Sequence, residues 1–148
     1  MQKIIFAVIG IISMLGLLPG CANQATARIT PGADMSRVKS FYVVTQPDDK
    51  RGVGKLIQAS LTKRGYATTI GPEKPAPYKA DALVTYLDKW MWDITMYMIE
   101  LTVVIRNPDN NFPLATGNSM HASLTRLSPE AMVEEVLGNI FKASKEAP

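Results

Sequence analysis

A chain of 148 residues is enough for about one domain and can bury a core without disulfide bonds. Its 16 lysines and arginines stand against 13 aspartates and glutamates, a net charge of +3 that is too balanced to favour nucleic acid or a polybasic membrane patch. One cysteine and one histidine exclude a disulfide framework and leave a zinc site without obvious ligands.

The N-terminal residues have the pattern of a secretory signal peptide. A short segment with a positive charge at Lys3 is followed by an uncharged apolar run over 4–18. This run is shorter than the roughly 18 to 20 apolar residues that a membrane-spanning helix needs. We therefore expect residues 1–20 to be a signal peptide that is cleaved and is not part of the fold.

The only cysteine, Cys21, comes directly after this segment. The letters LPGC at 18–21 resemble the bacterial lipobox, in which a small residue precedes a cysteine that is acylated and becomes the new N-terminus; Pro19 departs from the usual small residue. A palmitate-bearing Cys21 would anchor the protein stably, since two or three acyl chains are enough for that. Because Ala22 and not aspartate follows the cysteine, the resemblance to lipoproteins further implies sorting to the outer membrane, with the domain facing the periplasm. The alternative is an ordinary signal peptide with an incidental or buried cysteine.

The next segment, residues 21–37, is predicted to be a flexible tether. It is small and polar, contains Pro31 and Gly32, and has no hydrophobic period. The folded domain is predicted over 38–143, followed by a polar tail over 144–148.

The predicted domain begins with a strand, a helix and a second strand. Residues 40–45 are apolar, β-branched and aromatic, and a turn-forming segment follows them. The helix is predicted because apolar residues recur at helical spacing before Gly65, which is placed to end it. These apolar residues are Val53, Leu56, Ile57 and Leu61. The second strand is predicted over 66–70.

A long stretch with high strand propensity, 81–106, must fold back on itself. At about 3.3 Å per residue it would exceed about 80 Å as one strand, more than a domain of this size can hold. We place a hairpin turn at 92–95, between strands over 82–91 and 96–106. Residues 113–124 are expected to return antiparallel to the second of these strands.

The last predicted element is an amphipathic helix. Ser128 is a good N-cap and Pro129 suits the first helical position. The apolar stripe that must pack on a sheet is formed by Met132, Val133, Val136, Leu137, Ile140 and Phe141. The predicted fold is an α+β domain of order β-α-β-β-β-β-α, with a mainly antiparallel sheet and two helices packed on one face.

No segment has the pattern of a catalytic site. The letters RGVGKL at 51–56 lack the spacing of a Walker loop, which needs four residues between its glycines and a hydroxyl after the lysine. Ser119 and Ser123 flank His121 on a predicted strand without an acid and an oxyanion hole. We therefore expect a non-catalytic protein without a cofactor. A small two-carboxylate hydrolase is the less favoured class, and its acids would be Asp88, Asp93 and Glu100.

The segment DKWMWDITMYMIE at 88–100 is unusually rich in tryptophan and methionine and leaves three interpretations open. The first is core packing, with methionines filling space around the aromatic rings. The second is a partner-binding surface, since these residue types are enriched at protein interfaces. Its apolar anchors would be Trp90, Trp92, Tyr97 and Met98. The third is a Cu(I) site, in which the thioethers of Met96 and Met98 bind the metal near Trp92 and His121.

Two stretches, ADALVTYLDKWMWDITMYMIEL at 80–101 and NSMHASLTRLSPEAMVEEVLGNIF at 118–141, resemble an uncharacterised family of small proteobacterial outer-membrane lipoproteins. The predicted topology is also loosely similar to lipoprotein cofactors of envelope machines. The resemblance implies an outer-membrane lipoprotein. We predict that it binds a protein partner in the cell envelope in an accessory or assembly role, and a second copy of the chain is a further candidate partner. The alternative function is a periplasmic Cu(I)-binding module.

Overall fold

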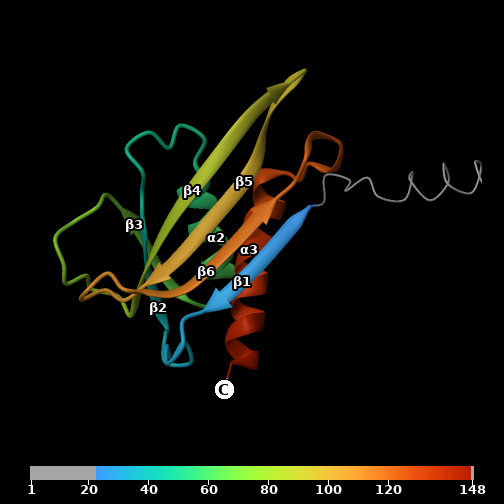
Figure 1. Cartoon of the computed structure of the whole chain (residues 1–148). Coiled ribbons are helices and arrows are strands. Elements are labelled where there is room, and N and C mark those ends of the chain that lie inside the picture. Colours follow the sequence, from blue (N-terminus) through green and yellow to red (C-terminus); the bar gives the residue numbers. More distant parts are fainter. Residues whose placement is uncertain (1–22, 148) are drawn as a thin grey trace, which may run out of the picture.

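The computed structural model describes residues 23–147, so the predicted signal peptide and Cys21 lie outside the described residues. Six strands form one sheet, and two helices lie together on one of its faces (Figure 1). The strands are β1 (Gln24–Ile29), β2 (Ser40–Val44), β3 (Ala67–Gly71), β4 (Ala82–Asp93), β5 (Thr95–Arg106) and β6 (Pro113–Met120). The helices are α2 (Val53–Lys63) and α3 (Pro129–Glu146), with a short 3-10 helix, η1 (Ser123–Thr125), before α3.

The strands lie in the order β1-β6-β5-β4-β2-β3 across the sheet. β4, β5, β6 and β1 pair antiparallel, whereas β2 pairs parallel with both β3 and β4. The helix α2 connects β2 to β3, since neighbouring parallel strands need a crossover connection. From β2 onward the order is β-α-β-β-β-β-α, so the predicted fold class is confirmed, with a mainly antiparallel sheet and both helices on one face.

The segment that was predicted to be a flexible tether, 21–37, contains an edge strand. β1 pairs with β6 along its whole length, from Gln24 opposite Met120 to Ile29 opposite Ala115. The tether prediction is therefore wrong over this strand, and the folded domain begins at β1. The strand has no hydrophobic period because most of its side chains are exposed, as is usual at the edge of a sheet.

The helix α2 ends on the glycine that the sequence predicts. Gly65 has φ +93°, the left-handed conformation that glycine adopts without a steric cost. The Tyr66 amide donates to the Leu61 carbonyl at 3.2 Å, which is the long hydrogen bond of a Schellman motif. The chain is thereby turned from α2 into β3.

The helix α3 begins where its signals predict. The Ser128 hydroxyl accepts a hydrogen bond from the Ala131 amide at 3.2 Å, and Pro129 takes the first helical position. The helix continues to Glu146, so the predicted polar tail over 144–148 is helical for most of its length. No proline follows Pro129 before that point, and the polar side chains of its last turn remain on the exposed side.

The core lies between the two helices and the sheet face that they cover. Its largest fully buried side chains are Phe41, Ile57, Leu61, Met98, Leu101, Ile105, Met132, Leu137 and Ile140. A Cβ on Gly117 of β6 would lie 2.8 Å from Cγ1 of Ile140, so the absence of a side chain there lets α3 approach the sheet. Within residues 23–147 no helix is both long and apolar enough to cross a membrane.

Candidate functional site

The hairpin formed by β4 and β5 projects beyond the rest of the sheet (Figure 1). β6 ends at Met120, which pairs with Glu100, whereas β5 extends back to Thr95 and has β4 as its strand neighbour there. The turn is made at Ile94, which has φ +59° and lies inside the region predicted for the turn. The long apolar stretch thus folds back as expected, and its end projects beyond α2 and α3 (Figure 1).

Four apolar side chains near this turn are exposed, and we call them the hairpin tip. They are Met91 (48% exposed), Trp92 (70%), Ile94 (86%) and Met96 (43%). Single exposed apolar residues are ordinary, but several on one projecting element indicate an interaction site. Ile94 also adopts a left-handed conformation that costs a residue with a Cβ roughly 1–2 kcal/mol, although glycine or asparagine would suit the turn better.

The structure separates the four residues predicted as partner-binding anchors. Trp92 is exposed, but Trp90 is half-buried, with the Arg51 guanidinium 4.2 Å from the centre of its ring. Tyr97 is only 8% exposed and Met98 is fully buried. Tyr97 and Met98 therefore contribute to packing and are wrong as surface anchors.

The exposed residues that the sequence prediction missed lie on the same hairpin. Met91 and Ile94 were not singled out, and Met96 was considered only as a metal ligand. Strand alternation alone places Met91 on the face opposite to that of Trp90 and Trp92. The pairing of the hairpin is irregular, however, because a register shift between Lys89 and Trp90 leaves Ile99 opposite no residue of β4. Whether a side chain of the hairpin is buried also depends on where the neighbouring strand β6 ends, and no local sequence pattern of the hairpin indicates that point.

The residues that would bind Cu(I) do not share one environment in the structure. Met96 and Met98 point to the same face of β5, but Met96 is 43% exposed and Met98 is fully buried. Nε2 of His121 lies 2.8 Å from Oε2 of Glu135, and this hydrogen bond occupies the nitrogen that was expected to face the metal. Within the described part of the chain, no cluster of three histidine, cysteine, aspartate or glutamate residues has metal-binding geometry.

His121 belongs to a buried polar cluster between β6 and α3. The Ser119 hydroxyl and His121 Nε2 both contact Oε2 of Glu135. Burial raises the pKa of Glu135, but the hydrogen bonds from Ser119 and His121 outweigh it and hold the pKa below its usual value. The carboxylate lies between the serine and the imidazole, so the imidazole is not bonded to the hydroxyl as in a catalytic triad, and Ser119 and His121 are both buried. This arrangement connects α3 to the sheet.

The three acids considered for a hydrolase do not converge. Asp88 accepts from the Trp90 indole, and Asp93 accepts from the Ser123 hydroxyl. Glu100 pairs with Lys89 at 2.6 Å and accepts from the Asn118 amide at 2.8 Å. Each of these three carboxylates therefore has its own partner, and the three are not bonded to one another.

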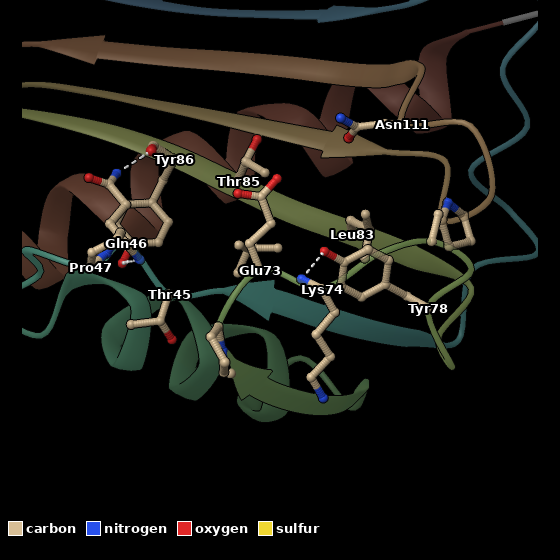
Figure 2. A pocket seen from close by; sticks show the side chains of 15 residues that line it. Thr45, Gln46, Pro47, Glu73, Lys74, Tyr78, Leu83, Thr85, Tyr86 and Asn111 are labelled. Carbon is tan, nitrogen blue, oxygen red and sulfur yellow. Dashed lines mark hydrogen bonds between the residues drawn. The ribbon is translucent and has the colours of Figure 1, made fainter.

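A recess of about 870 Å³ lies on the helix-free face of the sheet (Figure 2). Leu83 and Thr85 of β4 form part of its floor, and the proline-rich segment 72–78 forms one wall. This wall is fixed by the Tyr78 ring, whose centre lies 5.0 Å from that of Tyr42. The polar side chains that line the recess come from Thr45, Gln46, Glu73, Lys74, Thr85 and Asn111.

The glycines of the segment 51–56 do not form a phosphate cradle. The carboxylate of Asp49 accepts from the amides of Val53 at 2.9 Å and Gly54 at 2.8 Å, so the positive end of α2 already holds an anion. Burial raises the pKa of Asp49, but these amides and the Tyr86 hydroxyl outweigh it and lower the pKa.

Comparison with known proteins supports the fold. No protein-family model matches the chain, and no curated protein matches it in sequence. The PelC dodecamer from Paraburkholderia phytofirmans in space group P6 superposes with a TM-score of 0.56 and 14% identity over 84% of this chain and 99% of the PelC chain. A second PelC dodecamer, in space group C2, gives a TM-score of 0.54 at 14% identity over 84% and 98% of the two chains.

A weaker neighbour is a minor lipoprotein from Acinetobacter baumannii, with a TM-score of 0.26 and 12% identity over 74% of this chain and 88% of that one. At these identities the likeness to PelC shows a shared fold alone.

Proposed function

We propose that this protein is a lipoprotein of the outer membrane, anchored through lipid on Cys21, that faces the periplasm and binds a partner protein in the cell envelope in a non-catalytic accessory or assembly role. The observation that carries the proposal is the recess on the helix-free face of the sheet (Figure 2). The two helices leave this face open, and the concavity between β4 and the segment 72–78 is suited to a protruding side chain or an extended peptide.

The chemistry of the recess favours binding over catalysis. Its walls include Pro47, Pro72, Tyr78 and Leu83, which supply apolar and rigid contact surface. The polar groups are amide and hydroxyl side chains with one acid, Glu73, and one base, Lys74. The Tyr78 hydroxyl is engaged with the Lys74 amide at 2.8 Å. Such groups orient a bound segment, whereas general acid–base chemistry needs titratable groups that converge on one reacting atom.

A second copy of the chain is a further candidate partner. PelC, which shares the fold, forms dodecamers in its crystals. In the described part of the chain β1 and β3 are the edge strands of the sheet, and edge strands are able to pair with another chain.

The anchor is tested by palmitate labelling in cells. Wild-type protein is expected to carry label and to fractionate with the outer membrane, whereas Cys21→Ala loses the label. Unlabelled wild type would contradict the anchor.

The partner surface is tested with a photo-crosslinking amino acid at Tyr78. We expect a discrete adduct from this position, because it lines the recess. The control position is Lys142, which is exposed on α3, on the opposite face of the sheet. Identical adducts from both positions, or none from position 78, would contradict partner binding at the recess. An adduct of twice the mass of the protein would identify the partner as a second copy.

A further inference from the structure

The N-terminus of the folded domain and the hairpin tip emerge from the same end of the sheet (Figure 1). Gln24 begins β1 opposite Met120, and Met120 is in turn opposite Glu100 of β5. The Thr125 hydroxyl lies 2.6 Å from the side-chain oxygen of Asn23, so the chain is held at this end directly before β1. The chain therefore enters the fold beside the base of the projecting hairpin.

Chain lengths indicate how far the hairpin tip and Cys21 can each extend from the level of Gln24 and Glu100 in the sheet. β5 runs from Glu100 back to Thr95, a projection of about 17 Å at roughly 3.3 Å per residue. Gln24 follows Cys21 by three residues, a length of at most about 11 Å when fully extended. The projection of the hairpin exceeds this length by about 6 Å, so the end of the hairpin reaches past Cys21 where the two run in the same direction.

We propose that the hairpin tip inserts into the phospholipid leaflet that holds the acyl chains of Cys21. The inference depends on the lipid anchor of the proposed function and assigns a second membrane contact to the same molecule. A reach of several ångströms past the acylated residue agrees with the roughly 5–10 Å to which interfacial segments enter the boundary between headgroups and acyl chains.

The chemistry of the hairpin tip suits this boundary. Trp92 provides an amphipathic ring of the kind that gathers at membrane interfaces, and Ile94 and Met96 add apolar surface. The Arg126 guanidinium lies beside the end of the hairpin, with Nη1 3.0 Å from the Thr95 hydroxyl, where it is placed to meet lipid phosphates. Asp93 is bonded to Ser123 beside the tip, and its carboxylate keeps the insertion shallow.

The shape of the hairpin favours lipid over a protein partner. Successive residues of a strand point to opposite faces, so Met91 lies on one face of the hairpin and Trp92 and Met96 on the other, with Ile94 at the end. A protein that docks on one face leaves the other exposed to water. A leaflet surrounds a projecting tip and covers both faces and its end together.

The test uses the full chain, produced with its lipid and reconstituted into vesicles of phosphatidylethanolamine and phosphatidylglycerol with brominated acyl chains, which quench tryptophan emission on contact. Trp90 and Trp92 are the only tryptophans, so Trp90→Phe and Trp92→Phe each leave one reporter. We expect bromine to lower the emission of Trp92 by about half or more, since an inserted ring lies at acyl-chain depth. The emission of Trp90, which packs under Arg51, is expected to change little.

Flotation and palmitate content are measured on the same samples. Palmitate-bearing protein that floats with the vesicles while Trp92 remains unquenched overturns the insertion and leaves the anchor of the proposed function intact. Protein that neither carries palmitate nor floats overturns both.

A photo-crosslinker at Ile94 extends the test to cells, with Lys79 as an exposed control position. A lipid adduct from position 94 and none from position 79 supports insertion. Protein adducts alone from position 94 overturn it in favour of a protein partner. Because Ile94 is 86% exposed, Ile94→Ser keeps the fold and is expected to lower the quenching of Trp92.

Discussion

The hydroxyl of Tyr86, in the middle of β4, donates a 2.7 Å hydrogen bond to the carboxylate of Asp49, which caps the first amides of α2. One carboxylate therefore joins the start of the helix to the sheet beneath it. The Tyr86 oxygen also accepts from the Gln46 amide, so the loop between β2 and α2 is held at the same point. Burial and the neighbouring Asp49 raise the pKa of Tyr86, which keeps the hydroxyl protonated and donating.

Tyr86→Phe is expected to lower the free energy of unfolding by about 2 kcal/mol, because it removes a hydrogen bond to a charged group. Urea unfolding measures the change. Tyr78→Phe is the control, since the Tyr78 hydroxyl meets only an exposed backbone amide and its loss should cost less than about 1 kcal/mol. Equal losses in the two variants would show that the bond to Asp49 adds nothing.

The pKa of Asp49 predicts a loss of stability in acid. Its pKa is lower in the folded protein than in the unfolded chain, so folding favours the ionised carboxylate. The contribution is fully present above the unfolded pKa of about 4 and is lost as the pH falls through the folded pKa. Asp49→Asn should flatten the decrease in unfolding free energy below about pH 4. A variant that loses stability in acid as steeply as wild type would contradict this role.

Two helical glycines should respond in opposite directions to alanine. A Cβ on Gly54 of α2 would lie 2.8 Å from the Tyr86 hydroxyl, so Gly54→Ala must displace the contact with Asp49 and is expected to destabilise by about 1–3 kcal/mol. On α3 the nearest atom to a Cβ at Gly138 is an Arg64 nitrogen at 3.7 Å. Gly138→Ala is therefore expected to stabilise by roughly 0.5–1 kcal/mol. Thermal unfolding measures the change, and we expect a lower melting temperature for Gly54→Ala and a higher one for Gly138→Ala.

Local signals predicted several elements correctly. Ser128 and Pro129 identify the start of α3, and Gly65 identifies the end of α2, since caps involve residues within one turn of each other. That the stretch folds back followed from its length, because a single strand over 81–106 would not fit in the domain, and the least apolar point, 92–95, indicated where it turns.

The features that the sequence did not predict depend on distant residues. β1 is a strand only because β6 pairs with it, and Gln24 and Met120 are far apart in the chain. Met98 is buried and Met96 exposed on the same strand face, because the core includes Met98 and does not extend to Met96. The recess arises where the proline-rich loop folds over β4 through the contact of Tyr78 with Tyr42. None of these contacts leaves a pattern in a single segment.

Two adjacent glutamates of α3 should differ in their effect on stability. Glu135→Ala leaves Ser119 and His121 buried without their common acceptor, and a loss of about 2–3 kcal/mol is expected. Glu134→Ala breaks an exposed ion pair with Arg64 and should cost less than about 1 kcal/mol. Chemical unfolding compares them. Equal costs would mean that the buried cluster does not hold α3 to the sheet.

The final prediction separates the packing role of the hairpin from its surface. Met98→Ala removes a fully buried side chain from the core and is expected to cost about 2–5 kcal/mol of unfolding free energy, because it leaves a cavity. Met96→Ala, two residues away on the same face, removes a side chain that is 43% exposed, and its cost should be below about 1 kcal/mol. Urea unfolding of the two variants measures the difference. If Met96→Ala were the costlier change, the end of the hairpin would be part of the core, and the hairpin tip would not be available to a membrane.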